Sequence, residues 1–289
     1  MNKSDDTALF LGQLTRIADA LERKHPIVMA PDALPKADAY VWQSDIRQLV
    51  AVATVNRLDI GLLKGINVQR DDLLSNTMGF VQDFPANNAL LWGARGTGKS
   101  SLVKAVHGTV IERGHDLGLV EIHREDIADL PFLMAFLAQI DRHFIIFSDD
   151  LAFEGGESTY KSLKAALEGG IEGRPDNIVF YATSNRRHLM PRQMMENERS
   201  TAINPSETTE ETVSLSDRFG LWIGFHSIDQ DIYLEMIHEY VRFYNIKADS
   251  IDIRHEALAW SVGRGSRSGR VAWQFIINLA ARTKTSLRR

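Results

Sequence analysis

The chain has 289 residues, of which 44% are hydrophobic and 25% are charged, and this is enough for a globular protein with a sizeable core. It contains no cysteine, which excludes disulfide bonds and thiolate metal sites and is typical of an intracellular protein. The formal net charge of −5 gives no general attraction to nucleic acid, although it does not exclude a local basic groove.

The first part of the chain, residues 1–64, has a helical pattern and few signs of chemistry. Residues 1–7 are polar and acidic, unlike the start of a signal peptide. A helical pattern resumes over Ser44–Leu63, after prolines that interrupt the chain. We expect a helical N-terminal extension that acts as a platform or, alternatively, as a partner-docking module. Its first amphipathic face comprises Leu9, Phe10, Leu14, Ile17 and Leu21.

From residue 65 onward, helical and strand patterns alternate. A helix is expected over Val68–Phe84, and the other helices are predicted at Ser100–Arg113, Pro131–Ile140 and Ser158–Glu168. Short apolar runs separated by helices are typical of a parallel sheet covered by helices on both faces. Residues 65–228 are therefore predicted to form an α/β core. Its strands are expected at Ala89–Trp92, Leu119–Ile122, Phe144–Ser148, Ile178–Ala182 and Leu221–Phe225.

The last part, residues 229–289, is predicted to contain only helices, at Asp231–Tyr244, Arg254–Val262 and Arg270–Thr283. The polar connector Glu196–Ser214 is expected to be a mobile surface loop. No run in the chain approaches the roughly 20 apolar residues of a membrane span. We therefore expect a cytoplasmic protein with no membrane partner.

A glycine-rich loop follows the first strand of the predicted core and opens a helix. It satisfies the pattern G-x-x-x-x-G-K-[ST], which brings several backbone N–H groups and a helix N-terminus to one phosphate. A plain glycine turn is the alternative, and the eight matched positions with a strand before and a helix after disfavour it. We predict a nucleoside triphosphate site at Gly93, Ala94, Arg95, Gly96, Thr97, Gly98, Lys99, Ser100 and the following Ser101.

Two carboxylates follow the apolar run Phe144–Ser148. Phosphoryl transfer to water needs a held metal ion and a group that orients or activates the water. We predict that Asp149 binds Mg²⁺ together with the Ser100 hydroxyl, and that Asp150 acts on the water. An ordinary pair of helix-capping residues is the alternative reading of the two aspartates. Asn185, at the end of the run that starts at Ile178, is a candidate to hold the same water, or else only a capping residue.

The order of these features resembles the AAA+ ATPases. More narrowly, the strings LLWGARGTGKSSLVKA, FSDDLAFE, YATSNRRHL and SLSDRFGLW resemble a bacterial family described as an ATP-binding domain of unknown function. The resemblance extends from Gly65 to about residue 283 and weakens over the first 64 residues. It implies that the C-terminal helices form a lid, that residues 93–100 are the Walker A loop, and that Gly65 and Ile66 pack on adenine.

The resemblance also assigns roles to the polar residues. Asn185 matches the sensor 1 position, and Arg270 matches the lid arginine that contacts the γ-phosphate. Asp150 stands where many AAA+ proteins have a catalytic glutamate, and its side chain is shorter by about 1.5 Å. Glu154 is an alternative base that only its proximity supports. Arg218, before Phe219 and Gly220, matches the arginine that completes the site of a neighbouring subunit, which implies a ring or arc of identical chains. A surface ion pair with Asp217 is the alternative for Arg218.

These expectations favour an ATPase that hydrolyses MgATP in an oligomer and remodels or loads a protein or nucleic-acid client. The alternative is an ATP-gated switch or adaptor with little or no hydrolysis of its own. A GTPase is disfavoured because the guanine motif N-K-x-D is missing, and a small-molecule kinase is disfavoured by the arginine and the lid. The expected ligands are ATP and Mg²⁺.

Overall fold

The computed structural model describes residues 13, 16, 30–153, 157–169, 173–187, 189, 218–248 and 251–287. Their centre is a seven-stranded sheet with the order β2-β1-β4-β5-β6-β3-β7. Every neighbouring pair is parallel except β1 and β2, so the sheet is the mostly parallel one that the sequence predicts. The strands are β1 (Ala39–Gln43), β2 (Gln48–Ala51), β3 (Ala89–Gly93), β4 (Leu117–Glu121), β5 (His143–Ser148), β6 (Ile178–Ser184) and β7 (Leu221–Phe225).

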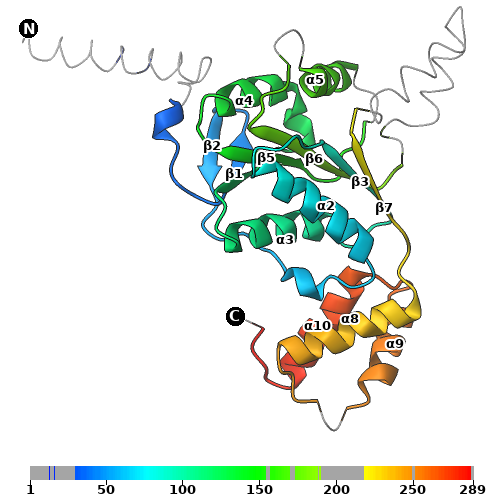
Figure 1. Ribbon diagram of the computed structural model, residues 1–289. Coiled ribbons are helices and arrows are strands. Elements are labelled where there is room, and N and C mark those ends of the chain that lie inside the picture. The colour runs from blue at the N-terminus through cyan, green and yellow to red at the C-terminus, as the bar shows by residue number, and fades with distance from the viewer. Residues whose placement is uncertain are drawn as a thin grey trace, which may run out of the picture.

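Helices cover both faces of the sheet (Figure 1). The helices α2 (Asn67–Phe80) and α3 (Lys99–Glu112) lie on one face, and α4 (Leu130–Leu137) and α5 (Glu157–Glu168) lie on the other. Alternate residues of β5 enter the two cores: Ile145 packs on the α2 and α3 side, and Ile146 packs on the α4 and α5 side. Because both faces are buried, a strand of this sheet reads as a continuous apolar run.

The predicted helix over Ser44–Leu63 is wrong. This part of the chain contains the end of a β-hairpin and a short 3-10 turn at Ile60–Leu62. The hairpin extends the central sheet, because β1 pairs in parallel with β4 and antiparallel with β2. The side chain of Trp42 is buried, and its Nε1 donates a hydrogen bond to Asp129 Oδ2 over 3.3 Å. The division of the chain at residues 64 and 228 stays a prediction. The part of the chain before residue 65 supplies two strands of the sheet, β1 and β2.

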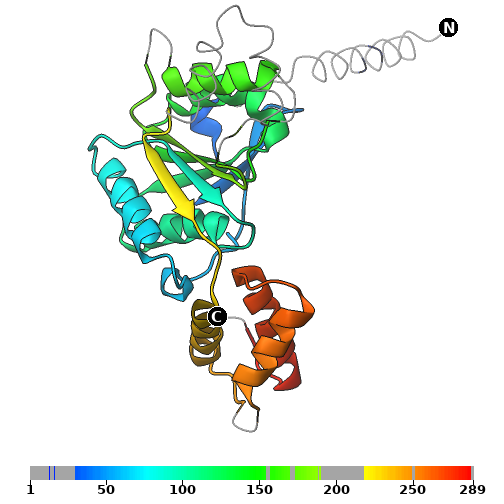
Figure 2. The ribbon, with the colours of Figure 1, turned by 90° about the vertical axis from the view of Figure 1, so that its right-hand side faces the viewer.

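The C-terminal helices form a separate small bundle, which we call the lid (Figure 2). It consists of α8 (Gln230–Phe243), α9 (Ile253–Gly263) and α10 (Gly269–Arg282), which share their own apolar core. Side chains cap the N-terminus of each helix: Asp229 accepts from Ile232 N, Asp252 from His255 N and Ser268 from Val271 N. Among the described residues, no helix combines the length and the apolar character that crossing a bilayer requires.

Candidate functional site

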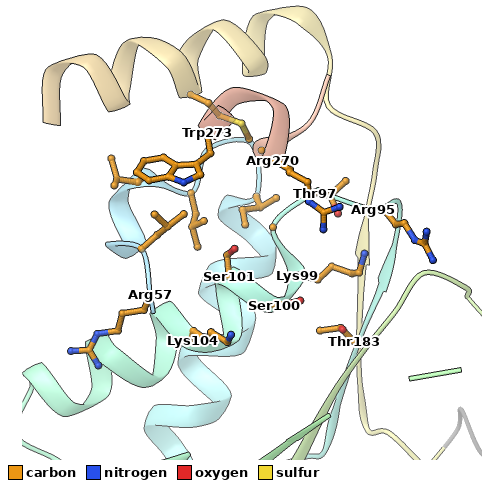
Figure 3. Close-up of a pocket in the computed structure, with 18 of the residues that line it drawn as sticks. Arg57, Arg95, Thr97, Lys99, Ser100, Ser101, Lys104, Thr183, Arg270 and Trp273 are labelled. Atoms are coloured by element: carbon orange, nitrogen blue, oxygen red, sulfur yellow. The ribbon is translucent and has the colours of Figure 1, made fainter. Parts of the chain in front are cut away.

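A cavity of about 670 Å³ lies between the carboxyl ends of the central strands and the lid (Figure 3). Because β5, β6 and β3 are neighbours in the sheet, their carboxyl ends place the predicted polar residues side by side. The structure therefore brings most of the predicted site into one wall. The predicted residues that line the cavity are Ile66, Arg95, Gly96, Thr97, Gly98, Lys99, Ser100, Ser101, Asp149, Asp150, Asn185 and Arg270.

The glycine-rich loop closes around the side chain of Lys99. The Nζ atom of Lys99 donates hydrogen bonds to the carbonyl oxygens of Gly93, over 2.9 Å, and Ala94, over 2.8 Å. Ala94 O also accepts from Thr97 Oγ1 over 2.8 Å. Lys99 is only 6% exposed, and it is the first residue of α3, so the helix N-terminus faces the loop. Gly93 and Ala94 thus hold the Lys99 side chain with their carbonyl oxygens, while the described cavity lining in the loop begins at Arg95.

Burial affects the pKa of Lys99. Desolvation is the largest influence and lowers the pKa of the ammonium group, and the nearby Arg95 lowers it further. The carboxylates of Asp149 and Asp150 oppose this shift by favouring the charged form. A bound anion beside Nζ would act in the same direction as these carboxylates. The loop therefore holds a buried cation that gains from a phosphate ligand.

The oxygen atoms expected to bind Mg²⁺ meet at the tip of β5. Ser100 Oγ lies 2.6 Å from Asp149 Oδ1, and Thr183 Oγ1 donates to the same carboxylate oxygen over 2.5 Å. A hydroxyl and a carboxylate fit Mg²⁺, which takes oxygen ligands and keeps several waters or phosphate oxygens. The described residues contain no group of three or more histidine, cysteine or acidic side chains that could hold a metal ion. A hydroxyl and a carboxylate leave the remaining Mg²⁺ positions to water or to substrate phosphates.

Asp150 is held by its neighbours. Its backbone is left-handed, with φ of 52°, and its N–H donates to Thr183 Oγ1 over 2.9 Å. Asn185 Nδ2 donates to Asp150 Oδ1, and Asn185 Oδ1 accepts from Lys99 Nζ over 3.2 Å. Asn185 therefore links the loop lysine to the second carboxylate. Thr183, which supports both aspartates, lies two residues before Asn185 at the same strand end, and that position is the signal that could have identified it.

The lid contacts the glycine-rich loop directly. Gly269 N donates to Gly96 O over 2.8 Å, and a Cβ atom on Gly96 would lie 2.9 Å from Ser268 Cβ. The other contact is at Gly65, where an added Cβ would lie 2.6 Å from the side chain of Ile232. Both glycines have positive φ, of 75° and 74°. Their missing side chains let the lid pack closely on both sides of the cavity, with Arg270 in its wall.

Several residues of the cavity wall were not identified from the sequence. Trp273 of the lid lies three residues after Arg270, on the same helix, and its ring centroid lies 5.3 Å from that of Tyr240. Lys104 lies one helical turn after Ser100 and lines the same wall as Ser101 (Figure 3). Helical spacing from the predicted residues is the signal that could have identified Trp273 and Lys104.

Arg218 is placed elsewhere, because it does not belong to the described wall of the cavity. Its side chain is 18% exposed, and its Nε donates to Glu168 Oε1 over 2.8 Å. The alternative partner Asp217 and the alternative base Glu154 lie outside the described residues, as does the predicted loop Glu196–Ser214.

Comparisons with known proteins identify the family and the fold. The family profile described as "Protein of unknown function (DUF815)" matches residues 35–283. No curated protein matches the chain. Among solved structures, the RuvB Holliday junction branch migration motor of Thermotoga maritima has 16% identity and a TM-score of 0.50, over 78% of this chain and 66% of that chain. The Orc1 protein of Aeropyrum pernix in complex with DNA has 15% identity and a TM-score of 0.53, over 78% and 63%.

These similarities establish the fold, which is that of the AAA+ P-loop ATPases. The chain spans slightly less than two thirds of the length of both solved relatives, at 66% and 63%.

Proposed function

The chain belongs to the DUF815 family. For this member we propose that it binds and hydrolyses MgATP in the cavity between the sheet and the lid. The observation that carries the proposal is the loop that closes on the buried Lys99, next to the hydrogen bond between Ser100 and Asp149. A buried cation beside a helix N-terminus and a hydroxyl–carboxylate pair match the needs of a triphosphate with its metal.

Each residue of the site then has a role. The backbone N–H groups of the loop and the Lys99 ammonium bind the phosphates, while Ser100 and Asp149 hold Mg²⁺. Bound Mg²⁺ would neutralise charge on the phosphate oxygens. Asp150 and Asn185 orient the attacking water, with Asp150 placed to accept its proton. Ile66 and the lid residue Trp273 give the cavity an apolar wall suited to the base.

We further propose that hydrolysis needs a neighbouring chain. Arg218 lies away from the described wall of its own cavity, so its proposed contact with a γ-phosphate is to the site of the next subunit. Such a head-to-tail contact builds a ring or an arc. The assembly would remodel or load a protein or nucleic-acid client. DNA is the client to test first, because one solved relative is a Holliday junction motor and another was solved with DNA.

An ATP-gated switch is the second candidate, and two contacts favour it. Asp150 is hydrogen bonded to Asn185, and Arg218 is paired with Glu168 of its own chain. Arg218 must leave Glu168 before it can act on a phosphate, and Asn185 occupies one of the two Asp150 carboxylate oxygens that could accept a proton from water. A protein in which these contacts persist would bind ATP and turn it over slowly.

Binding of ATP to the full chain, measured by titration calorimetry with Mg²⁺ and with a chelator, tests the site. We expect Mg²⁺ to tighten binding in the wild type and this gain to be lost in Asp149→Ala. Asp71→Asn is the matched control, because Asp71 forms an exposed ion pair with Arg70 on α2. Binding of ATP that is as tight in Asp149→Ala as in the wild type, with the same response to Mg²⁺, would refute the assignment of Asp149.

A further inference from the structure

A phosphate loop binds phosphate with its backbone N–H groups, so phosphate binding by the loop does not require an arginine side chain at position 95. Residues at this position of the loop contribute N–H groups, which any residue could supply. Here the position carries an arginine that is 76% exposed and lines the cavity beside Lys99 (Figure 3). An extra cation at the phosphate end of the cavity changes the charge balance of the site.

Arg95 belongs to the same cluster as the residues proposed to act on water. Its guanidinium nitrogen lies 3.9 Å from Asp150 Oδ2, while Asp150 Oδ1 accepts from Asn185. Asn185 in turn accepts from Lys99 over 3.2 Å. Two cations, Arg95 and Lys99, therefore flank one carboxylate and one amide at the carboxyl ends of β5 and β6.

The charge of Arg95 is not fully compensated in this arrangement. Arg95 lines the same cavity wall as Lys99, so the two cations repel each other. Its partner Asp150 is 3.9 Å away and exposed to solvent, so water screens the pair. The arginine expected to act on a phosphate from outside, Arg218, is instead 18% exposed and bonded to Glu168. Three arginines, Arg57, Arg95 and Arg270, line the chain's own cavity, and Arg95 is the one that lies next to Asp150.

We propose that the Arg95 side chain is a γ-phosphate ligand that each chain supplies to its own site. This rests on the proposed MgATP site. When a triphosphate occupies the loop, Arg95 moves from the single charge of Asp150 to the more highly charged phosphate. Its guanidinium can bind phosphate oxygens with two parallel hydrogen bonds. Asp150 loses its cationic partner in the same event and is left to contact the water. Arg95 consequently discriminates ATP from ADP, because only ATP carries the γ-phosphate.

The test compares the affinities of the full chain for ATP and ADP, each with Mg²⁺, by titration calorimetry. We expect Arg95→Ala to weaken ATP binding by about 10-fold or more, as the loss of a hydrogen bond to a charged group implies, and to leave ADP binding within about 2-fold. Arg95→Lys should recover part of the preference for ATP, because it keeps the charge without the planar fork. Arg187→Ala is the matched control, since Arg187 is an exposed arginine at the same edge of the sheet, over the ring of Trp92 at 5.3 Å.

The outcomes separate this proposal from the one on which it depends. A wild type that binds neither nucleotide would refute the site as a whole and Arg95 with it. A wild type that binds both nucleotides, together with an Arg95→Ala variant that keeps the wild-type ratio of the two affinities, would overturn only the role of Arg95. A ratio that changes equally in Arg95→Ala and Arg187→Ala would also overturn it, because a general loss of positive charge would then explain the effect.

Discussion

Replacement of Gly96 by alanine tests the contact between the phosphate loop and the lid. Gly96 has φ of 75°, where an L-residue costs about 1–2 kcal/mol. The new Cβ would also lie 2.9 Å from Ser268 Cβ, and Ser268 caps α10. Displacing that cap costs about 1 kcal/mol more. Gly114→Ala is the matched control, because Gly114 has φ of 90° and its added Cβ would meet no atom within 4 Å among the described residues other than Gly114 itself and its chain neighbours.

The two variants should differ by about 1 kcal/mol in the free energy of unfolding, measured by urea denaturation, since the backbone cost is common to both. Titration with MgATP should separate them further. We expect Gly114→Ala to bind like the wild type and Gly96→Ala to bind about 5-fold more weakly, because a cost of about 1 kcal/mol at the contact between loop and lid is about fivefold in affinity. Equal MgATP affinities for Gly96→Ala and Gly114→Ala would refute a cavity that depends on this contact.

Three other predictions concern single side chains. Lys99→Ala should abolish ATP binding in calorimetry, because it removes the buried ammonium; binding and turnover like the wild type would reject the loop as the phosphate site. Arg218→Ala should bind ATP nearly normally and lose hydrolysis in a phosphate-release assay, whereas normal turnover would exclude a role across an interface. Burial lowers the pKa of His107 to about 4, so only the unfolded state takes up its proton between pH 7 and 5, and the free energy of unfolding should fall by about 2 kcal/mol over this window. Urea titrations of His107→Gln should lack that part of the pH dependence, and an unchanged slope would contradict the assignment.

The core and the loop could be predicted because their signals are local. Strands buried on both faces read as apolar runs, and the glycines of the loop read as a fixed spacing before a helix. The lid helices carry their own start signals, such as the capping residues Asp229, Asp252 and Ser268. These features depend little on distant residues, so the structure agrees with them closely.

The hairpin of β1 and β2 could not be predicted in the same way. Its stability comes from residues far along the chain: β1 pairs with β4, and Ser44 Oγ bonds to Asp126 Oδ1 over 2.5 Å. A helical period over Ser44–Leu63 was therefore overridden by tertiary contacts. The same applies to the position of Arg218, whose partner Glu168 lies 50 residues away at the end of α5. Spacing identified the arginine but not the ion pair that holds it.

The measurement that tests the central claim most directly is the rate of MgATP hydrolysis per subunit over a range of protein concentrations, with particle size measured by light scattering on the same samples. The account predicts a rate that rises steeply as oligomers form, and no such rise for Arg218→Ala in oligomers of the same size. A rate per subunit that is constant from monomer to oligomer would contradict the action of Arg218 across an interface. Tight ATP binding with no hydrolysis at any size would contradict the ATPase and support the ATP-gated switch.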